Sequence, residues 1–143
     1  MATMNEVIAR IKQDLSEEFE DVAVEGDNGL TVTIDDESIY LSFVEHTTDD
    51  LHRVFVEVEG VIESLWPCDP ELIEWAVRNG TDYLVGTLVP TLDDTAENVT
   101  LTFRYRTLAD CLTADAACVA VFAVAEARSE LFDAFHDWYG EHI

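Results

Sequence analysis

The stretch VFVEV at residues 54–58 is the segment that decides the fold class. Val54, Val56 and Val58 alternate with Phe55 and Glu57, and successive side chains of a β-strand point to opposite faces of the sheet. The alternation predicts a strand with three valines on one dry face. One dry and one wet face is typical of an antiparallel sheet that is covered on one side only.

Further strands are expected on both sides of this segment. Val99, Leu101 and Phe103 alternate with Thr and Arg residues, which again predicts one dry and one wet face. Residues 26–29 read GDNG, a turn signal that separates the first two apolar stretches of the chain. The remaining predicted strands cover residues 22–24, 30–34, 39–44 and 83–89.

Two helices are expected from their start signals. Thr3 and Glu6 form a capping box ahead of apolar residues at helical spacing. Asp69 suits the N-cap and Pro70 the first position of a second helix, and Gly80 suits its C′ position.

The last part of the chain, from about Leu108 to Tyr139, has the composition of a long helix that residues 113–115 could break or restart. The resulting order is helix, three or four strands, helix, two strands, helix. This order predicts an α+β, two-layer sandwich with an antiparallel sheet and helices on one face. A length of 143 residues suits one domain, residues 1–143.

The charge of the chain excludes some kinds of partner. Against 7 Lys and Arg residues there are 31 Asp and Glu residues, so the formal net charge is -24. The hydrophobic fraction of 48% is too high for a disordered acidic chain, so we expect the acidity on the surface of a folded domain. Such a surface repels phosphate groups, and we expect no nucleic-acid partner and no membrane-surface partner.

We expect a cytoplasmic protein. The N-terminal residues lack the apolar core of a signal peptide, and the most apolar run, residues 116–125, is about half as long as a membrane span. The 3 cysteines include no CxxC pair, which argues against a disulfide framework and against a thiol-lined zinc site. Cys111 and Cys118 are expected to share a helix face as small buried residues.

No catalytic site is recognisable in the sequence, so we expect a non-enzymatic protein without a cofactor. No glycine-rich phosphate loop and no GxSxG motif occurs. A metal site is the open alternative at His46 and His52, which flank Asp49 and Asp50, because imidazole and carboxylate together suit a divalent ion. A solvated hairpin turn explains the same residues, and we expect no metal.

Two more acidic segments carry side chains that could bind an ion. The loop Asp93-Asp94-Thr95-Ala96-Glu97 lacks the spacing of an EF-hand, so a solvated turn is expected. Asp133 and His136 lie three positions apart near the end of the chain, without a clear third ligand.

The aromatic residues give the clearest indication of function. Tyr40 and Phe55 fall on the sheet face opposite the main apolar positions, and apolar rings on a polar face indicate a contact surface. Trp66 precedes Pro67 in an expected loop, where a core role and a contact role are equally supported. We therefore predict peptide contacts at Tyr40, Phe55 and Trp66, and core positions for Trp75 and Trp138.

The order of elements resembles that of YbjN-like proteins and class I type III secretion chaperones. The segment from Leu30 to Val61, which contains SIYLSFVEH and LHRVFVEVEGVI, is similar to the YbjN-like strand meander. The sequence DPELIEWAVRNGTDYLVGTLVP resembles the helix and strand that follow it in that family. The resemblance implies a non-enzymatic, chaperone-like bacterial protein that forms a homodimer and holds a polypeptide segment of a client in an apolar groove.

Two hypotheses remain open at this point. The first is a polypeptide-binding, chaperone-like module, whose acidic surroundings would favour basic client segments and whose strand edges could pair with an added strand. The second is an acidic regulatory or immunity-type protein that blocks a basic protein partner. Rising salt weakens the second kind of contact and leaves apolar contact in place.

Overall fold

The strand predicted at residues 54–58 lies at the centre of the molecule, in β4 (His52–Pro67). The computed structural model describes residues 3–80, 83, 85–110 and 112–142. Its elements confirm the α+β sandwich and the predicted order. The other elements are α1 (Met4–Ser16), β1 (Val22–Glu25), β2 (Gly29–Ile34), β3 (Glu37–Thr47), α2 (Pro70–Asn79), β5 (Thr87–Leu92), β6 (Asn98–Leu108) and α3 (Ala114–His142).

The strands form one antiparallel sheet in the order β1-β2-β3-β4-β6-β5. β4 therefore pairs with β3 on one side and with β6 on the other. Val54, Val56 and Val58 are at most 1% exposed, as the alternation predicts. Burial of each such side chain contributes about 1.5–3 kcal/mol, so the three valines fix which face of β4 points inward.

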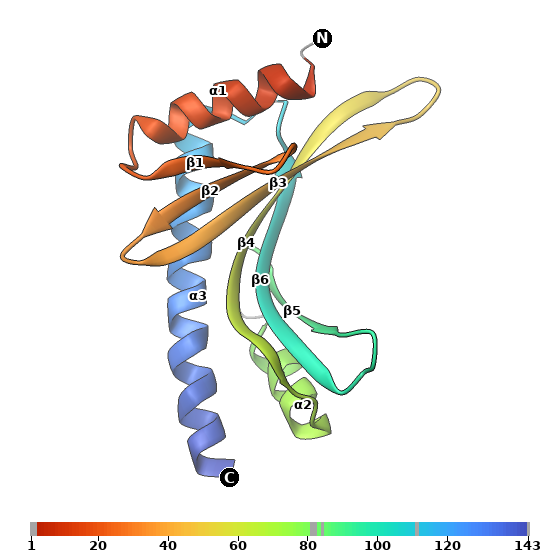
Figure 1. Cartoon of the computed structure of the whole chain (residues 1–143), viewed down its shortest axis with the longest axis vertical. Helices are drawn as coiled ribbons and strands as arrows, with labels where there is room; N and C mark the ends of the chain where they lie inside the picture. The colour runs from red at the N-terminus through yellow and green to blue at the C-terminus, as the bar shows by residue number, and fades with distance from the viewer. Residues whose placement is uncertain (1–2, 81–82, 84, 111, 143) are drawn as a thin grey trace.

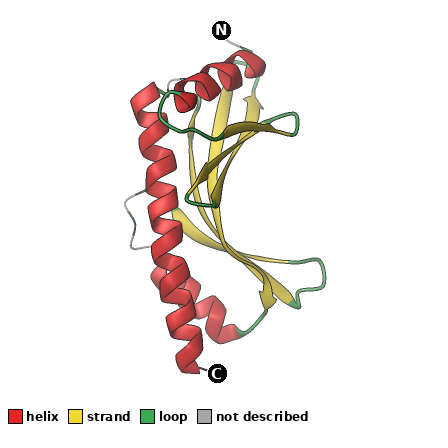
Figure 2. Ribbon diagram, turned by 60° about the vertical axis from the view of Figure 1, so that its left-hand side comes forward, coloured by secondary structure: helices red, strands yellow, loops and turns green. Residues whose placement is uncertain are grey.

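All three helices lie on one side of the sheet, as Figures 1 and 2 show. α3 runs along β4 and β6, while α1 crosses near the upper end of α3 and contacts it. Toward the β5–β6 hairpin, β4 and β6 curve away from α3, and α2 lies between the helix and the curved strands (Figure 2). The core is thus a single apolar layer between the helices and the sheet.

The predicted helix starts are confirmed, but Gly80 has a different role from the one expected. The Thr3 hydroxyl accepts a hydrogen bond from Glu6 N at 3.2 Å, and the Asp69 carboxylate accepts one from Glu71 N at 2.9 Å. Gly80 has φ of -80°, so it does not occupy a left-handed C′ position. A Cβ atom at Gly80 would lie 2.5 Å from Leu88 Cβ, and the glycine is required there by close approach of α2 to β5.

Several predicted boundaries are wrong. β6 continues to Leu108 and α3 starts only at Ala114, so the long helix is shorter than expected. Cys111 lies outside the described residues and precedes the start of α3. The strand expected at residues 83–89 is found at Thr87–Leu92; residues 81, 82 and 84 are outside the described part of the chain.

Trp66 lies in β4 and not in a loop, because β4 extends to Pro67. The extension includes two register shifts against β6, one between Val61 and Glu63 and one between Glu63 and Trp66. Each extra residue reverses the alternation of faces. The first shift turns Glu63 toward α3, and the second returns Trp66 to the helix side, where it pairs with the buried Val99.

Both edges of the sheet are poorly suited to pairing with another strand. β1 has only 4 residues, and Pro90 lies in the middle of the 6-residue β5. Proline has no backbone N–H to donate, and short or proline-containing edge strands resist strand addition. The edges therefore give little support to added-strand pairing.

None of the helices in the described part of the chain is long and apolar enough to cross a membrane.

Candidate functional site

The sheet face that points away from the helices, here called the open face, carries a row of apolar side chains. Val44 of β3 lies opposite Phe55 of β4, and Phe55 lies opposite Leu108 of β6. Val44 is 52% exposed and Leu108 is 38% exposed. These side chains extend across three neighbouring strands, so they form a continuous patch and not isolated surface residues.

Two rows of mixed charge follow the apolar row along the strands. Read from β3 to β6, these rows are Ser42–Glu57–Arg106 and Tyr40–Glu59–Arg104. The Arg106 guanidinium donates a hydrogen bond to Glu57, and Arg104 Nε donates one to Glu59 Oε1 at 2.7 Å. Arg104 Nε also lies 3.7 Å from Glu57 Oε2, which links the two rows into one ion-pair network.

A hollow of about 300 Å³ joins the apolar row to this network. We call it the open-face hollow; it is lined by Val44, His46, Phe55, Glu57 and Arg106. The His46 ring approaches Phe55 edge-on, with the ring centroids 6.2 Å apart. Its volume is at the lower end of the range for ligand pockets, which suits one or two apolar side chains.

Glu57 stays ionised at the bottom of this hollow. Partial burial raises its pKa, but the hydrogen bond from Arg106 and the positive charges of Arg104 and Arg106 outweigh that effect. The net result is a pKa of Glu57 below its ordinary value. The carboxylate is therefore engaged by its arginine neighbours and is a poor candidate for a general acid.

Tyr40 and Phe55 lie on the open face, as predicted, whereas Trp66 lies on the opposite side of the sheet. The Trp66 ring meets Phe135 and Tyr139 of α3 edge-on, at centroid distances of 5.4 and 4.9 Å. The Trp66 Nε1 atom is buried without a hydrogen-bond partner. The three predicted contact residues therefore do not form one surface.

Val44 and Leu108, which pair with Phe55, and the nearby Arg106 were not predicted from the sequence as part of this surface. Val44 lies four residues after Tyr40 on β3, so the alternation of a strand places both side chains on the same face. This pattern could have identified Val44 from the sequence. Leu108 and Arg106 reach Phe55 only through the pairing of β4 with β6, which are separated in sequence by α2 and β5.

The geometry does not bring the predicted metal-site residues together. His46 lies on the open face beside Phe55, whereas His52 Nε2 lies 3.6 Å from Glu45 Oε2 on the other face of the hairpin. Among the residues that the structure describes, no three His, Cys, Asp or Glu side chains are grouped as metal ligands.

The acidic loop between β5 and β6 is held by one of its own carboxylates. Asp93 accepts hydrogen bonds from the Asn98 side chain at 3.0 Å, from Thr95 Oγ1 at 3.0 Å and from Glu97 N at 3.1 Å. These bonds, with the one from the Asn98 side chain the largest cause, lower the pKa of Asp93 below its ordinary value. Asp93 thus works as a turn-forming residue.

His136 and Cys118 have neighbours that indicate a structural role for each. His136 Nε2 lies 2.6 Å from Glu63 Oε1, so the histidine is paired across to β4 and not with Asp133. Cys118 is buried on α3, and burial followed by the negative charges of Glu18 and Asp115 raises the pKa of its thiol. A raised pKa keeps the thiol protonated and unreactive.

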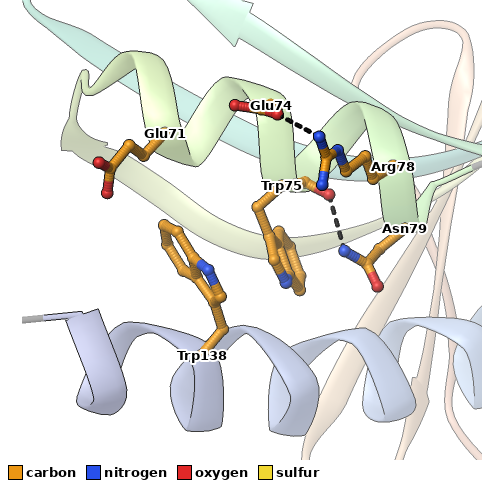
Figure 3. A pocket seen from close by; sticks show the side chains of 6 residues that line it. All are labelled: Glu71, Glu74, Trp75, Arg78, Asn79 and Trp138. Carbon is orange, nitrogen blue, oxygen red and sulfur yellow. Dashed lines mark hydrogen bonds and ion pairs between the residues drawn. The ribbon is translucent and has the colours of Figure 1, made fainter.

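A second hollow, of about 390 Å³, lies between α2 and the C-terminal part of α3 (Figure 3). We call it the α2–α3 hollow; its lining residues are Glu71, Glu74, Trp75, Arg78, Asn79 and Trp138. The rings of Trp75 and Trp138 are stacked, with centroids 5.8 Å apart, and Trp75 also meets Phe135 at 5.5 Å. Trp75 is buried, as predicted for a core residue, whereas Trp138 is only half-buried and packs against the core.

The comparisons with known proteins support the fold but indicate no function. No protein-family model matches the chain, and no curated protein matches it. Among solved structures, an uncharacterized protein from Methanothermobacter thermautotrophicus is similar, with a TM-score of 0.57 and 12% sequence identity. The likeness covers 94% of this chain and 98% of the other, so the whole α+β arrangement is shared.

Proposed function

We propose that this protein is a non-enzymatic, chaperone-like module that binds a polypeptide segment of a client on its open face. The observation that carries the proposal is the row formed by Val44, Phe55 and Leu108 beside the open-face hollow. Val44 and Leu108 are exposed and Phe55 is half-buried, on a face that no helix of the described chain covers. Covering them with an apolar segment removes this surface from water and favours binding.

The arrangement is compatible with the resemblance to YbjN-like proteins and type III secretion chaperones. Those families hold client segments in apolar grooves, and the open-face hollow offers a groove of side-chain size. The homodimer that the resemblance implies is part of the same proposal, and sedimentation equilibrium of the purified chain measures it directly.

Two matched valine variants test the proposed surface. Val44→Asp places a charge in the apolar row, whereas Val119→Asp places the same charge on α3; these valines are 52% and 62% exposed. A library of fluorescent apolar peptides is titrated against the wild type and both variants by anisotropy. We expect saturable binding by the wild type, a loss of about tenfold or more for Val44→Asp, and no change for Val119→Asp.

Phe55→Asp supplies a second variant at the same hollow, with circular dichroism used to show that it remains folded. Equal binding by all variants, or no binding of any peptide by the wild type, would overturn the proposal. Capture of a basic protein only at low salt would instead favour the acidic blocking protein, because screening removes such contacts.

A further inference from the structure

The open face differs in charge from the rest of this acidic molecule. The chain has 7 Lys and Arg residues, and three of them, Arg53, Arg104 and Arg106, lie on the open face. Arg53 lies opposite His46, and Arg104 and Arg106 lie opposite Glu59 and Glu57. The other four basic residues, Arg10, Lys12, Arg78 and Arg128, are on the helices.

Of the two charged residues that line the open-face hollow, Arg106 and Glu57, the arginine is the more exposed. The Arg106 side chain is 61% exposed, whereas the Glu57 side chain beneath it is 18% exposed. Glu57 already accepts a bond from Arg106 and lies close to Arg104. A guanidinium carries five N–H donors, so Arg106 keeps outward-facing donors after it has bonded Glu57.

Two other carboxylates lie near the hollow without lining it: Glu59 follows Glu57 on the same face of β4, and Asp110 accepts a hydrogen bond from Val54 N at 2.9 Å. Glu59 is occupied by Arg104, with a 2.7 Å bond. Glu25 lies in the same row as Glu57 and Arg106, but on β1, three strands away from Glu57. At about 4.8 Å between strands, this separation is roughly 14 Å. A ligand in the hollow therefore meets the exposed Arg106, His46 and the already paired Glu57 beside apolar side chains.

We infer that the segment bound on the open face is acidic as well as apolar, with an apolar side chain in the hollow and a neighbouring carboxylate on Arg106. Arginine suits this role because its planar fork binds carboxylates with two parallel hydrogen bonds. The inference rests on the proposed function. It reverses the expectation from composition alone that the acidic surface favours a basic client.

The net charge of -24 affects the approach of such a segment. At long range the whole molecule repels an acidic peptide, and the arginines attract it only at contact. Screening by salt removes the long-range part first, since it acts over distances beyond the Debye length. The association rate constant for an acidic peptide is therefore expected to rise with moderate salt, whereas that for a basic peptide falls.

Three peptides of equal length test the inference. Each carries one Phe, flanked by Glu in the first peptide, by Gln in the second and by Lys in the third. Dissociation constants are measured by anisotropy for the full-length wild type, for Arg106→Gln and for Arg78→Gln. Arg78 is the matched control, because it is an exposed arginine on α2 that pairs with Glu74 at 2.6 Å, outside the open face.

We expect the wild type to bind the Glu peptide severalfold more tightly than the Gln peptide, and the Lys peptide least tightly. Arg106→Gln removes this preference, and Arg78→Gln keeps it. Glu57→Gln is expected to change the preference in the opposite direction, toward still tighter binding of the Glu peptide, because it releases Arg106 from its internal partner. A role of Arg106 in folding alone would not produce this opposite pair of effects.

The outcomes separate the inference from the proposed function. Equal binding of the three peptides, or tightest binding of the Lys peptide, would overturn the inference and leave an apolar peptide-binding face. Failure of all three peptides to bind would overturn both. If Val44→Asp instead converts a dimer into a monomer, the occupant of the open face is a second copy of this chain.

Discussion

The open-face hollow and the α2–α3 hollow have similar volumes, about 300 and 390 Å³, but they differ in what their apolar side chains contact. In the α2–α3 hollow, Trp75 and Trp138 stack on each other, and Trp75 also packs on Phe135. In the open-face hollow, Val44 remains 52% exposed on the uncovered face of the sheet.

This difference shows that the size of a hollow is a weaker guide to function than the packing of its walls. Side chains that already contact one another gain little from a ligand, and their removal leaves a cavity in the core. Side chains that remain exposed contribute little to folding and can gain from being covered. Mutations at the two hollows should therefore separate stability from binding.

The largest expected effect is that of Trp75→Ala. Trp75 is 8% exposed, and truncation of a buried tryptophan lowers the free energy of unfolding by about 3–5 kcal/mol. Urea denaturation followed by circular dichroism measures the loss. Val77→Ala on the same helix, at a residue that is 57% exposed, is the control and should change stability by less than about 0.5 kcal/mol. A loss below about 1 kcal/mol for Trp75→Ala would contradict the structural role of the α2–α3 hollow.

Trp66→Ala is expected to cost less, about 2 kcal/mol, because Trp66 is only half-buried against α3. The affinity of the folded protein for peptides should not change. Trp66→Phe should recover part of the stability, since it keeps an aromatic ring and removes a buried N–H without an acceptor, which costs about 1–3 kcal/mol. Weaker peptide binding by a folded Trp66 variant would contradict this expectation and support the peptide contact that the sequence predicts for Trp66.

An acid titration of Asp93→Ala tests the β5–β6 loop, which lies outside both hollows. The folded-state pKa of Asp93 is lowered from its ordinary value of 3.8, so its contribution is present above that pH and is lost as the pH falls through the lowered pKa. The variant should be less stable than the wild type near neutral pH, and the difference should shrink below about pH 4. A difference that stays constant down to about pH 2 would show that the carboxylate charge plays no part.

The smallest expected effect on stability is that of Val44→Thr, which keeps the branched shape preferred in strands. The free energy of unfolding should change by less than about 0.5 kcal/mol, because the residue is exposed. Affinity for apolar peptides should fall severalfold, since the hydroxyl must be desolvated on binding. Val119→Thr on α3 serves as the control for affinity. If neither variant changes affinity, the apolar row is not the contact surface.

Much of the fold follows from local patterns. The alternation at residues 54–58 places Val54, Val56 and Val58 in the core, and the caps at Thr3 and Asp69 start α1 and α2 as predicted. These features depend on neighbouring residues only, which is why a single sequence is sufficient to find them.

The candidate site depends on contacts between distant parts of the chain. Phe55 and Leu108 are paired through β4 and β6, and no local pattern specifies that pairing. The two register shifts in β4 could not be predicted from the sequence either. Because of the first shift, the Glu63 side chain points toward α3 and pairs with His136. Alternation alone predicts which residues share a face of one strand, but not which residues of the next strand they meet.

The short β1 and the proline in β5 also bear on how long a client would remain bound. A partner that extends a sheet is held by a series of backbone hydrogen bonds that must break together. A partner on the open face is held by side chains alone, and it can leave while the sheet stays intact. We therefore expect short residence times and rapid exchange between clients, a property that suits transient protection of a segment more than permanent assembly.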